Sequence, residues 1–117
     1  MSWDEAKRGA PQISGMRRGL HYEKLVLSDG AVHGPAELAQ ALAAGFQPHY
    51  VLIRVRVGAG AAAGAGVAWR ADGVPPTATD GMPCEAPNEE DFNGDPASLQ
   101  FIQLTADTVT VHLHYFY

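Results

Sequence analysis

The chain has 117 residues, of which 46% are hydrophobic, and its formal net charge is -5. A chain of this length usually builds a single hydrophobic core, so we expect one domain. There is no apolar run of about 18 residues, and the charged N-terminus lacks the apolar stretch of a signal peptide, so neither a membrane partner nor export is expected. The only cysteine is Cys84, which excludes an intrachain disulfide.

Charge is divided unevenly along the chain. Residues 1–70 contain eight Lys and Arg against five Asp and Glu, a net +3, whereas residues 71–117 contain eight Asp and Glu and no Lys or Arg. If the halves also separate in space, neighbouring copies can pair basic with acidic surface, while direct binding of nucleic acid is disfavoured. The alternative is a solvated surface whose asymmetry disappears on folding.

The first residues predict an extended basic arm ahead of a single folded domain. Residues 1–19 are rich in Gly and Pro and show little apolar periodicity, a pattern typical of a segment that becomes ordered on a partner or of a plain floppy terminus. The arm contains two basic pairs: Lys7, Arg8, Arg17 and Arg18. The domain itself is expected over residues 20–117.

Alternating apolar residues predict the first strands. Residues 21–27 alternate and stop at an Asp-Gly turn, and residues 50–57 alternate Val51, Ile53 and Val55 against polar neighbours, so the second face of that strand is partly wet or meets a partner. Between them, residues 35–44 predict a short helix with Pro35 in its first turn.

The second half of the chain predicts more strands. The Gly-Ala run after residue 57 is not followed by a helix, which disfavours a phosphate loop and favours a long flexible hairpin connection to a strand at 66–70. Residues 88–98 are interpreted as an acidic turn region. The alternating runs at 99–105 and 107–117 predict an antiparallel hairpin. The expected fold is mainly β: a small antiparallel β-sandwich or jelly-roll-like domain with one short helix and the N-terminal arm.

Two patterns of possible metal ligands are weak. His112 and His114 project from one strand face and would need a third ligand from His49, Asp107 or elsewhere, so a surface or interface pair is the preferred interpretation.

A second pattern, Asp91, Asn93 and Asp95, matches the start of a calcium loop. The pattern then breaks at Pro96 and Ile102, where such a loop needs Gly and Glu, which favours an Asx-type turn.

The possible nucleophiles Ser28, Ser98 and Cys84 lack a recognisable general base nearby. We therefore expect no enzyme activity, no cofactor and no metal site.

Trp69 and the aromatic tail at residues 114–117 have two interpretations. They can be stacking platforms for sugars or bases, or core and interface residues. Their alternation with Val and Leu favours the second interpretation.

The loop after Trp69 carries the most distinctive residues in the chain. Its sequence, VAWRADGVPPTATDGMP, resembles the RWRDDGxxPTxxxGM-like signature of a family of small virion-associated proteins of tailed bacteriophages. Two later stretches match the family pattern as well, and the resemblance covers residues 49–117. The matching residues are Trp69, Arg70, Asp72, Gly73, Pro76, Thr77, Gly81 and Met82, then Phe101 and Ile102, then Val111, Leu113, Tyr115 and Phe116.

The chain departs from the family pattern in three ways. Ala71 stands where an Asp is usual, the Gly-Ala connection is longer, and the helix at 35–44 is an addition. Within the loop, Arg70 or Asp72 can pair across the loop or with a neighbouring copy, while Thr77, Thr79 and Asp80 can satisfy backbone donors.

The resemblance implies a structural protein of the virion, assembled in the bacterial host cytoplasm. Its expected partners are the major capsid protein or other virion subunits and further copies of itself, as a capsid decoration protein. A neck, tail or fibre-base location and a carbohydrate-binding host-attachment module are the alternatives. The candidate interface residues are Lys7, Arg8, Arg17, Arg18, Trp69, Arg70, Asp72, Tyr115 and Tyr117.

Overall fold

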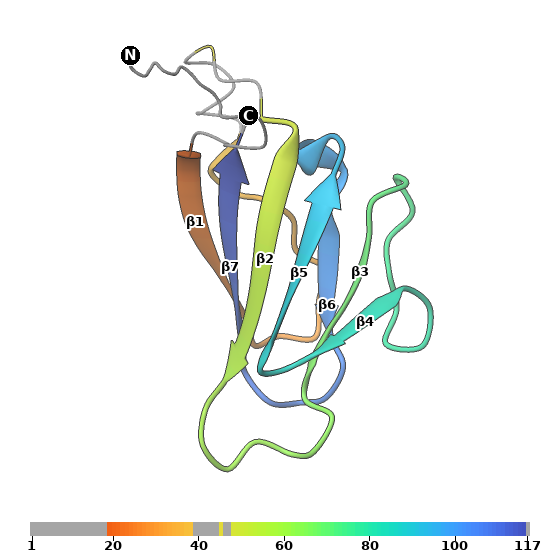
Figure 1. The fold of residues 1–117 in the computed structure, drawn as a ribbon. Helices are drawn as coiled ribbons and strands as arrows, with labels where there is room; N and C mark the ends of the chain where they lie inside the picture. The colour runs from red at the N-terminus through yellow and green to blue at the C-terminus, as the bar shows by residue number, and fades with distance from the viewer. Residues whose placement is uncertain (1–18, 39–44, 46–47, 117) are drawn as a thin grey trace.

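The protein folds into two antiparallel β-sheets, one of four strands and one of three (Figure 1). The computed structural model describes residues 19–38, 45 and 48–116. The strand orders are β1-β7-β2-β5 and β4-β3-β6. The strands are β1 (Gly19–Leu27), β2 (Tyr50–Val57), β3 (Gly66–Arg70), β4 (Met82–Glu85), β5 (Asn88–Asn93), β6 (Gln100–Gln103) and β7 (Val109–Phe116), with a 3-10 turn η1 (Pro96–Ser98) before β6.

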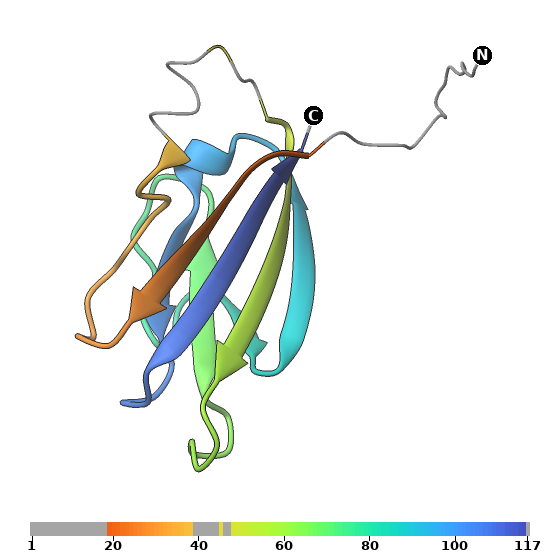
Figure 2. The ribbon, with the colours of Figure 1, turned by 90° about the vertical axis from the view of Figure 1, so that its left-hand side faces the viewer.

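This mainly β, sandwich-like architecture confirms the predicted fold class. Figure 2 shows β1, β7, β2 and β5 side by side as one layer. The predicted helix over 35–44 falls largely on residues 39–44, outside the described residues, and the arm over 1–19 falls there except for Gly19.

The core lies between the two sheets and is built by alternate residues of the strands. Alternate residues are buried from Glu23 to Leu27 in β1, from Val51 to Val55 in β2 and from Val109 to Tyr115 in β7, as the period of a half-covered strand requires. The buried apolar side chains that form the core cluster are Leu25, Leu27, Leu38, Val51, Ile53, Val55, Val67, Trp69, Cys84, Leu99, Phe101, Val109, Val111, Leu113 and Tyr115.

The hairpin predicted for the last two strands is wrong. β6 pairs with β3, whereas β7 pairs with β1 and β2, so residues 104–108 cross from one sheet to the other. The alternating pattern of these strands is the same whether the next strand joins its own sheet or the opposite one. Local periodicity therefore located both strands without defining their partners.

The Gly-Ala connection is likewise a crossover and not a hairpin, since β2 and β3 belong to different sheets. The backbone N–H of Ala62 donates to Oδ2 of Asp107 at 3.2 Å, and Thr105 Oγ1 donates to the same oxygen at 2.7 Å. The two loops at this end of the sandwich are thus joined by one carboxylate.

Two strands were missed by sequence reasoning. β4 begins within the segment interpreted as loop, and β5 lies in the segment interpreted as an acidic turn. Both are edge strands, and their polar outward residues hide the period-two pattern. The register pairs Leu52 with Asp91 and Arg54 with Glu89, so β5 adds carboxylates beside β2.

A buried carboxylate joins β1, β7 and the segment after β1. Glu23 is 2% exposed. Its Oε2 accepts a hydrogen bond of 2.6 Å from the Tyr115 hydroxyl, and its Oε1 accepts from the backbone N–H groups of Ala36 and Glu37 at 2.9 and 3.0 Å. These three donors replace the water that the carboxylate loses on burial. Burial, followed by the hydrogen bond and charge of Glu23, raises the pKa of Tyr115.

Replacing Glu23 with Ala is expected to lower the free energy of unfolding by about 2–4 kcal/mol, because the buried hydroxyl of Tyr115 and two part-buried backbone N–H groups lose their acceptor. Urea denaturation measures the change. Glu85→Ala, at an exposed position of β4, is the control and should stay within about 0.5 kcal/mol of the parent. Equal unfolding midpoints for the Glu23 variant and the parent would contradict this role.

Candidate functional site

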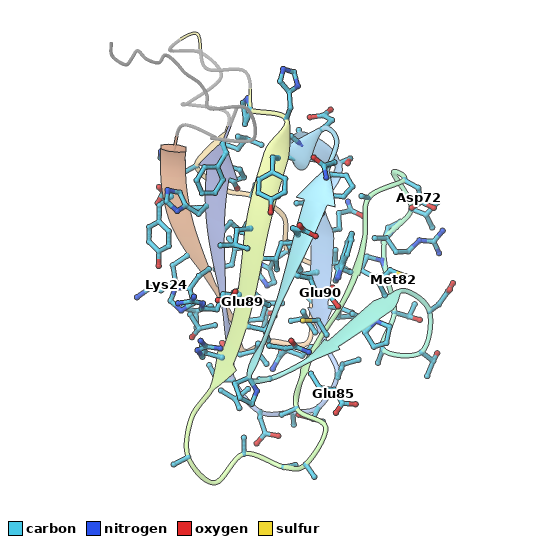
Figure 3. All side chains as sticks on the ribbon, in the orientation of Figure 1. Lys24, Asp72, Met82, Glu85, Glu89 and Glu90 are labelled. Atoms are coloured by element: carbon cyan, nitrogen blue, oxygen red, sulfur yellow. The ribbon has the colours of Figure 1, made fainter. Side chains whose placement is uncertain are left out.

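Two surfaces of the sandwich carry exposed charged or apolar side chains on a backbone that hydrogen bonds hold in place. The first is the signature loop, residues 71–81, which connects β3 to β4. The second is the outer face, the side of the four-stranded sheet turned away from the core. Figure 3 shows Lys24 at the β1 side of the molecule and Asp72 and Met82 at the opposite side.

The signature loop is held in place by Arg70 at the end of β3. Its guanidinium donates to both carboxylate oxygens of Asp72, at 3.1 and 2.5 Å, and to Asp80 at 3.2 Å. Asp72 also accepts from the backbone N–H of Val74 at 3.2 Å. The hydrogen bond from Arg70 is the main cause that lowers the pKa of Asp72 to about 2. Intrachain pairing across the loop, one of the two predicted uses of Arg70 and Asp72, is therefore observed.

Backbone contacts complete the signature loop. Thr77 and Asp80 exchange N–H···O=C hydrogen bonds of 2.9 and 3.2 Å, so their main chains pair where side-chain contacts were expected. Pro76 is fully buried. A Cβ at Gly81 would lie 3.3 Å from Pro76 and 3.2 Å from the carbonyl oxygen of Trp69, so the loop packs directly on β3.

The signature loop also exposes apolar surface. The side chains of Val74 and Met82, the latter at the start of β4, are 47% and 58% exposed. Met82 also borders a shallow hollow of about 470 Å³, whose other lining residues are Trp69, Arg70, Ala71, Asp72, Asp80 and Gly81. This is a rigid patch with apolar and charged groups at fixed positions.

Trp69 belongs to the core more than to the surface. It is 9% exposed, and its indole N–H donates to Oε1 of Glu90 on β5 at 2.8 Å. The ring of Phe92 lies edge-on at 5.9 Å. Trp69 thereby links the two sheets, and little of its ring is open for stacking on a sugar.

The remaining candidate interface residues divide into two groups. Tyr115 is fully buried, so the structure contradicts a surface role for it. The others lie outside the described residues: Lys7, Arg8, Arg17, Arg18 and Tyr117.

The outer face carries His112 and His114 on β7, as predicted. A hydrogen bond of 2.5 Å joins Nδ1 of His112 to the Tyr22 hydroxyl, and the ring of His114 lies 4.4 Å from that of Phe116. Partial burial and the positive charges of Lys24, Arg54 and Arg56 lower the pKa of His112. Within the described ranges, no group of three or more His, Cys, Asp or Glu is placed to hold a metal ion.

Two acidic residues of the possible calcium pattern make hydrogen bonds within the fold. Asp91 accepts from the Tyr50 hydroxyl at 2.9 Å, and Asp95 caps the turn η1 by accepting from the N–H of Ala97 at 3.0 Å. Asp95 thus makes the Asx-type contact that the sequence favoured.

Burial, with a smaller contribution from Glu90, raises the pKa of Cys84 to about 11, which keeps its thiol protonated near neutral pH.

Sequence reasoning missed several residues of the two surfaces. Glu90 meets Trp69 through the packing of one sheet on the other, and Tyr22 meets His112 through the pairing of β1 with β7. Their partners are 21 and 90 positions away in sequence. The one local signal was the polar alternation of 50–57, which indicated a second face on β2 that is wet or meets a partner.

Comparison with known proteins gave no assignment: no family model matches the chain, and neither curated proteins nor solved structures yielded a match. Among the described residues, no helix is long and apolar enough to span a membrane.

The ion pair of the signature loop makes a direct prediction. The carboxyl of Asp72 should titrate at a pKa of about 2, and Arg70→Gln should return it toward its ordinary value of 3.8, because the guanidinium stabilises the ionised form. The stability that this pair contributes is fully present above the ordinary pKa of 3.8 and is lost as the pH falls through about 2. Carboxyl NMR titration measures the pKa of Asp72 in the parent and in the variant. An unchanged Asp72 titration in the variant would contradict the pairing.

Proposed function

We propose that this protein is a non-catalytic structural component of a tailed-phage or phage-like particle, one that decorates and stabilises the capsid. The sequence of the signature loop supports this proposal by its resemblance to small virion-associated proteins. A neck, tail or fibre-base component is the second location consistent with the same resemblance.

The observation that carries the proposal is the geometry of the signature loop. Arg70 holds both ends of the loop through Asp72 and Asp80, while Val74 and Met82 remain exposed. A loop that is already ordered loses little conformational entropy when a partner binds. Exposed apolar side chains beside fixed charges suit a protein–protein contact better than catalysis.

The charge distribution supports adhesion to protein and not to nucleic acid. The chain is acidic overall, at -5, so a polyphosphate is repelled at long range. The basic N-terminal arm supplies a second, separate contact for the major capsid protein or a neighbouring subunit. Weak contacts of this kind hold firmly when many copies act together on one lattice.

Quantitative mass spectrometry of gradient-purified particles from the encoding strain tests the proposal. We expect the chain in near-equal copy number to the major capsid protein. The double variant Val74→Ser/Met82→Ser should be recovered on particles at least roughly tenfold less, because the loop patch loses its apolar contacts. Val26→Ser on β1 is the matched control, since Val26 is 54% exposed and lies away from the loop.

Each outcome of this experiment has a distinct meaning. Complete absence of the chain from particles overturns the proposed function. A ratio of a few per cent of the capsid protein moves the protein to the neck, tail or fibre. Full recovery of the double variant overturns the role of the loop.

The arm is tested in the same assay with a chain that begins at residue 19. We expect an unchanged unfolding transition and loss of particle attachment, because the four basic residues Lys7, Arg8, Arg17 and Arg18 are removed. Attachment equal to that of the full chain would show that the arm makes no contact.

A further inference from the structure

The outer face of the four-stranded sheet contains a hollow of about 290 Å³, which we call the basic hollow. It extends over β1, β7 and β2, which lie side by side in that order. The strand register aligns Tyr22, His114 and Leu52 across these strands, so one end of the hollow is aromatic and apolar. The residues that line it are Tyr22, Leu52, Arg54, Arg56, His112 and His114.

The other end of the basic hollow is cationic. The next row across the three strands is Lys24, His112 and Arg54, and Arg56 follows Arg54 on the same face of β2. The Cβ atoms of paired residues on neighbouring strands are about 5 Å apart, so Lys24 and Arg54 flank His112 closely. Burial and the charges of Lys24, Arg54 and Arg56 lower the pKa of His112, which shows that the cations act at one place.

Much of this positive charge is not neutralised within the fold. Arg54 pairs with Glu89 of β5. The register of β2 with β5 ends one residue before Arg56, so no carboxylate of β5 stands opposite it, and its guanidinium donates to a backbone carbonyl at 3.3 Å. Among the described residues, neither Lys24 nor Arg56 has a carboxylate partner. A net positive charge therefore remains on either side of β7.

The aromatic wall of the basic hollow is held in place. A hydrogen bond of 2.5 Å joins the Tyr22 hydroxyl to Nδ1 of His112, and the two rings stack at 6.0 Å. The ring of His114 lies edge-on to Tyr22 at 6.2 Å. A wall that is already ordered loses little conformational entropy when a ligand binds.

We propose that the basic hollow binds a carboxylate of an acidic segment on a partner protein, with Arg56 as its main cation. Arginine suits this role, because its planar guanidinium can donate two parallel hydrogen bonds to a carboxylate. An apolar residue next to the carboxylate packs on Tyr22 and Leu52. The inference rests on the proposed function and deepens it, since it names the chemistry of the subunit that contacts this face.

The surroundings of the hollow select a carboxylate on a protein over other anions. A chain of phosphates that crosses the sheet would meet Glu89 and Asp91 on β5, and the net charge of -5 repels a polyanion at long range. A free phosphate would leave the ring of Tyr22, which is 50% exposed, without a contact. A segment in which an apolar residue adjoins an acidic one is complementary to both ends of the hollow.

NMR titration of the full-length chain with two short peptides tests the proposal. The peptides are acetylated and amidated Gly-Phe-Asp-Phe-Gly and the same sequence with Asn in place of Asp, so they differ in the charge of one side chain. We expect the aspartate peptide to bind with a dissociation constant of about 0.1–1 mM and to shift the signals of Tyr22, Arg56 and His112. The asparagine peptide should bind roughly tenfold more weakly, because its contact with arginine is not charge-assisted on both sides.

Variants of the chain locate the contact. Arg56→Gln should weaken binding of the aspartate peptide by roughly tenfold, and Lys24→Gln, at the exposed rim, by a few fold. Thr79→Asp is the matched control, because it lowers the net charge by the same unit at an exposed position of the signature loop. It should bind the peptide like the parent. Circular dichroism shows that each variant is folded.

The titration of His112 gives a second readout at the hollow. The bound carboxylate should raise the pKa of His112, because a nearby negative charge stabilises the imidazolium, and the asparagine peptide should not. By linkage, the aspartate peptide binds more tightly as the pH falls through the pKa of this ring. The titratable and charged groups that face the ring are Tyr22 and Lys24 on β1, His114 on β7, and Arg54, with its partner Glu89, and Arg56 on β2.

Several results would overturn the proposal. Equal affinities of the two peptides, or an Arg56→Gln variant that binds like the parent, would show that the hollow does not recognise a carboxylate. No binding of the aspartate peptide up to about 10 mM would show that it takes no acidic segment. Tighter binding of inorganic phosphate or of a short oligothymidine would assign the hollow to a phosphate ligand instead of a protein.

The outcome is separable from the particle experiment, because it uses the purified protein and synthetic peptides. A chain that does not bind the aspartate peptide but is found on particles overturns the role of the basic hollow and leaves the structural role in place. A chain that binds the peptide at the hollow but is absent from particles does the reverse.

Discussion

The position of β2 is the constraint on which both the core and the outer face depend. β2 lies between β7 and β5, and its two-residue period sends Val51, Ile53 and Val55 inward and Leu52, Arg54 and Arg56 outward. A shift of register by one residue would place arginines between the sheets and valines in water. Burial of the inward valines and isoleucine of β2 therefore also fixes the positions of Leu52, Arg54 and Arg56 on the outer face.

Polar contacts across the layers define how the sheets meet. Trp69 of one sheet donates to Glu90 of the other, and buried Gln103 accepts from the N–H of Gly30 while donating to the carbonyl of Asp107. Apolar packing alone tolerates sliding between layers, whereas an unpaired buried polar group costs about 1–3 kcal/mol. These contacts favour one alignment of the sheets, and with it one placement of β5 beside β2.

Sequence reasoning predicted the features that depend on neighbouring residues, but only part of the outer face. The strands β1, β2, β6 and β7 follow from alternation, β3 was predicted where the chain resumes after the Gly-Ala run, and the pairing of Arg70 with Asp72 follows from a separation of two residues. The edge strands β4 and β5 were missed because one of their sides faces water and carries polar residues. The hairpin between β6 and β7 was wrong because a short link can either return along a sheet or cross to the other one. Alternation in β2 predicted a polar second face. The strands beside β2 are β7 and β5, which follow it much later in the sequence, so the rest of the outer face could not be predicted from local patterns.

The signature loop and the outer face belong to different sheets, and this separation matters for assembly. The loop connects β3 to β4, and the outer face is formed by β1, β7, β2 and β5. A partner bound at the loop therefore leaves the outer face of the four-stranded sheet uncovered. Two surfaces on different sheets can each make a weak contact, and once the first contact has formed the second becomes intramolecular, so the pair together binds more firmly than either surface alone.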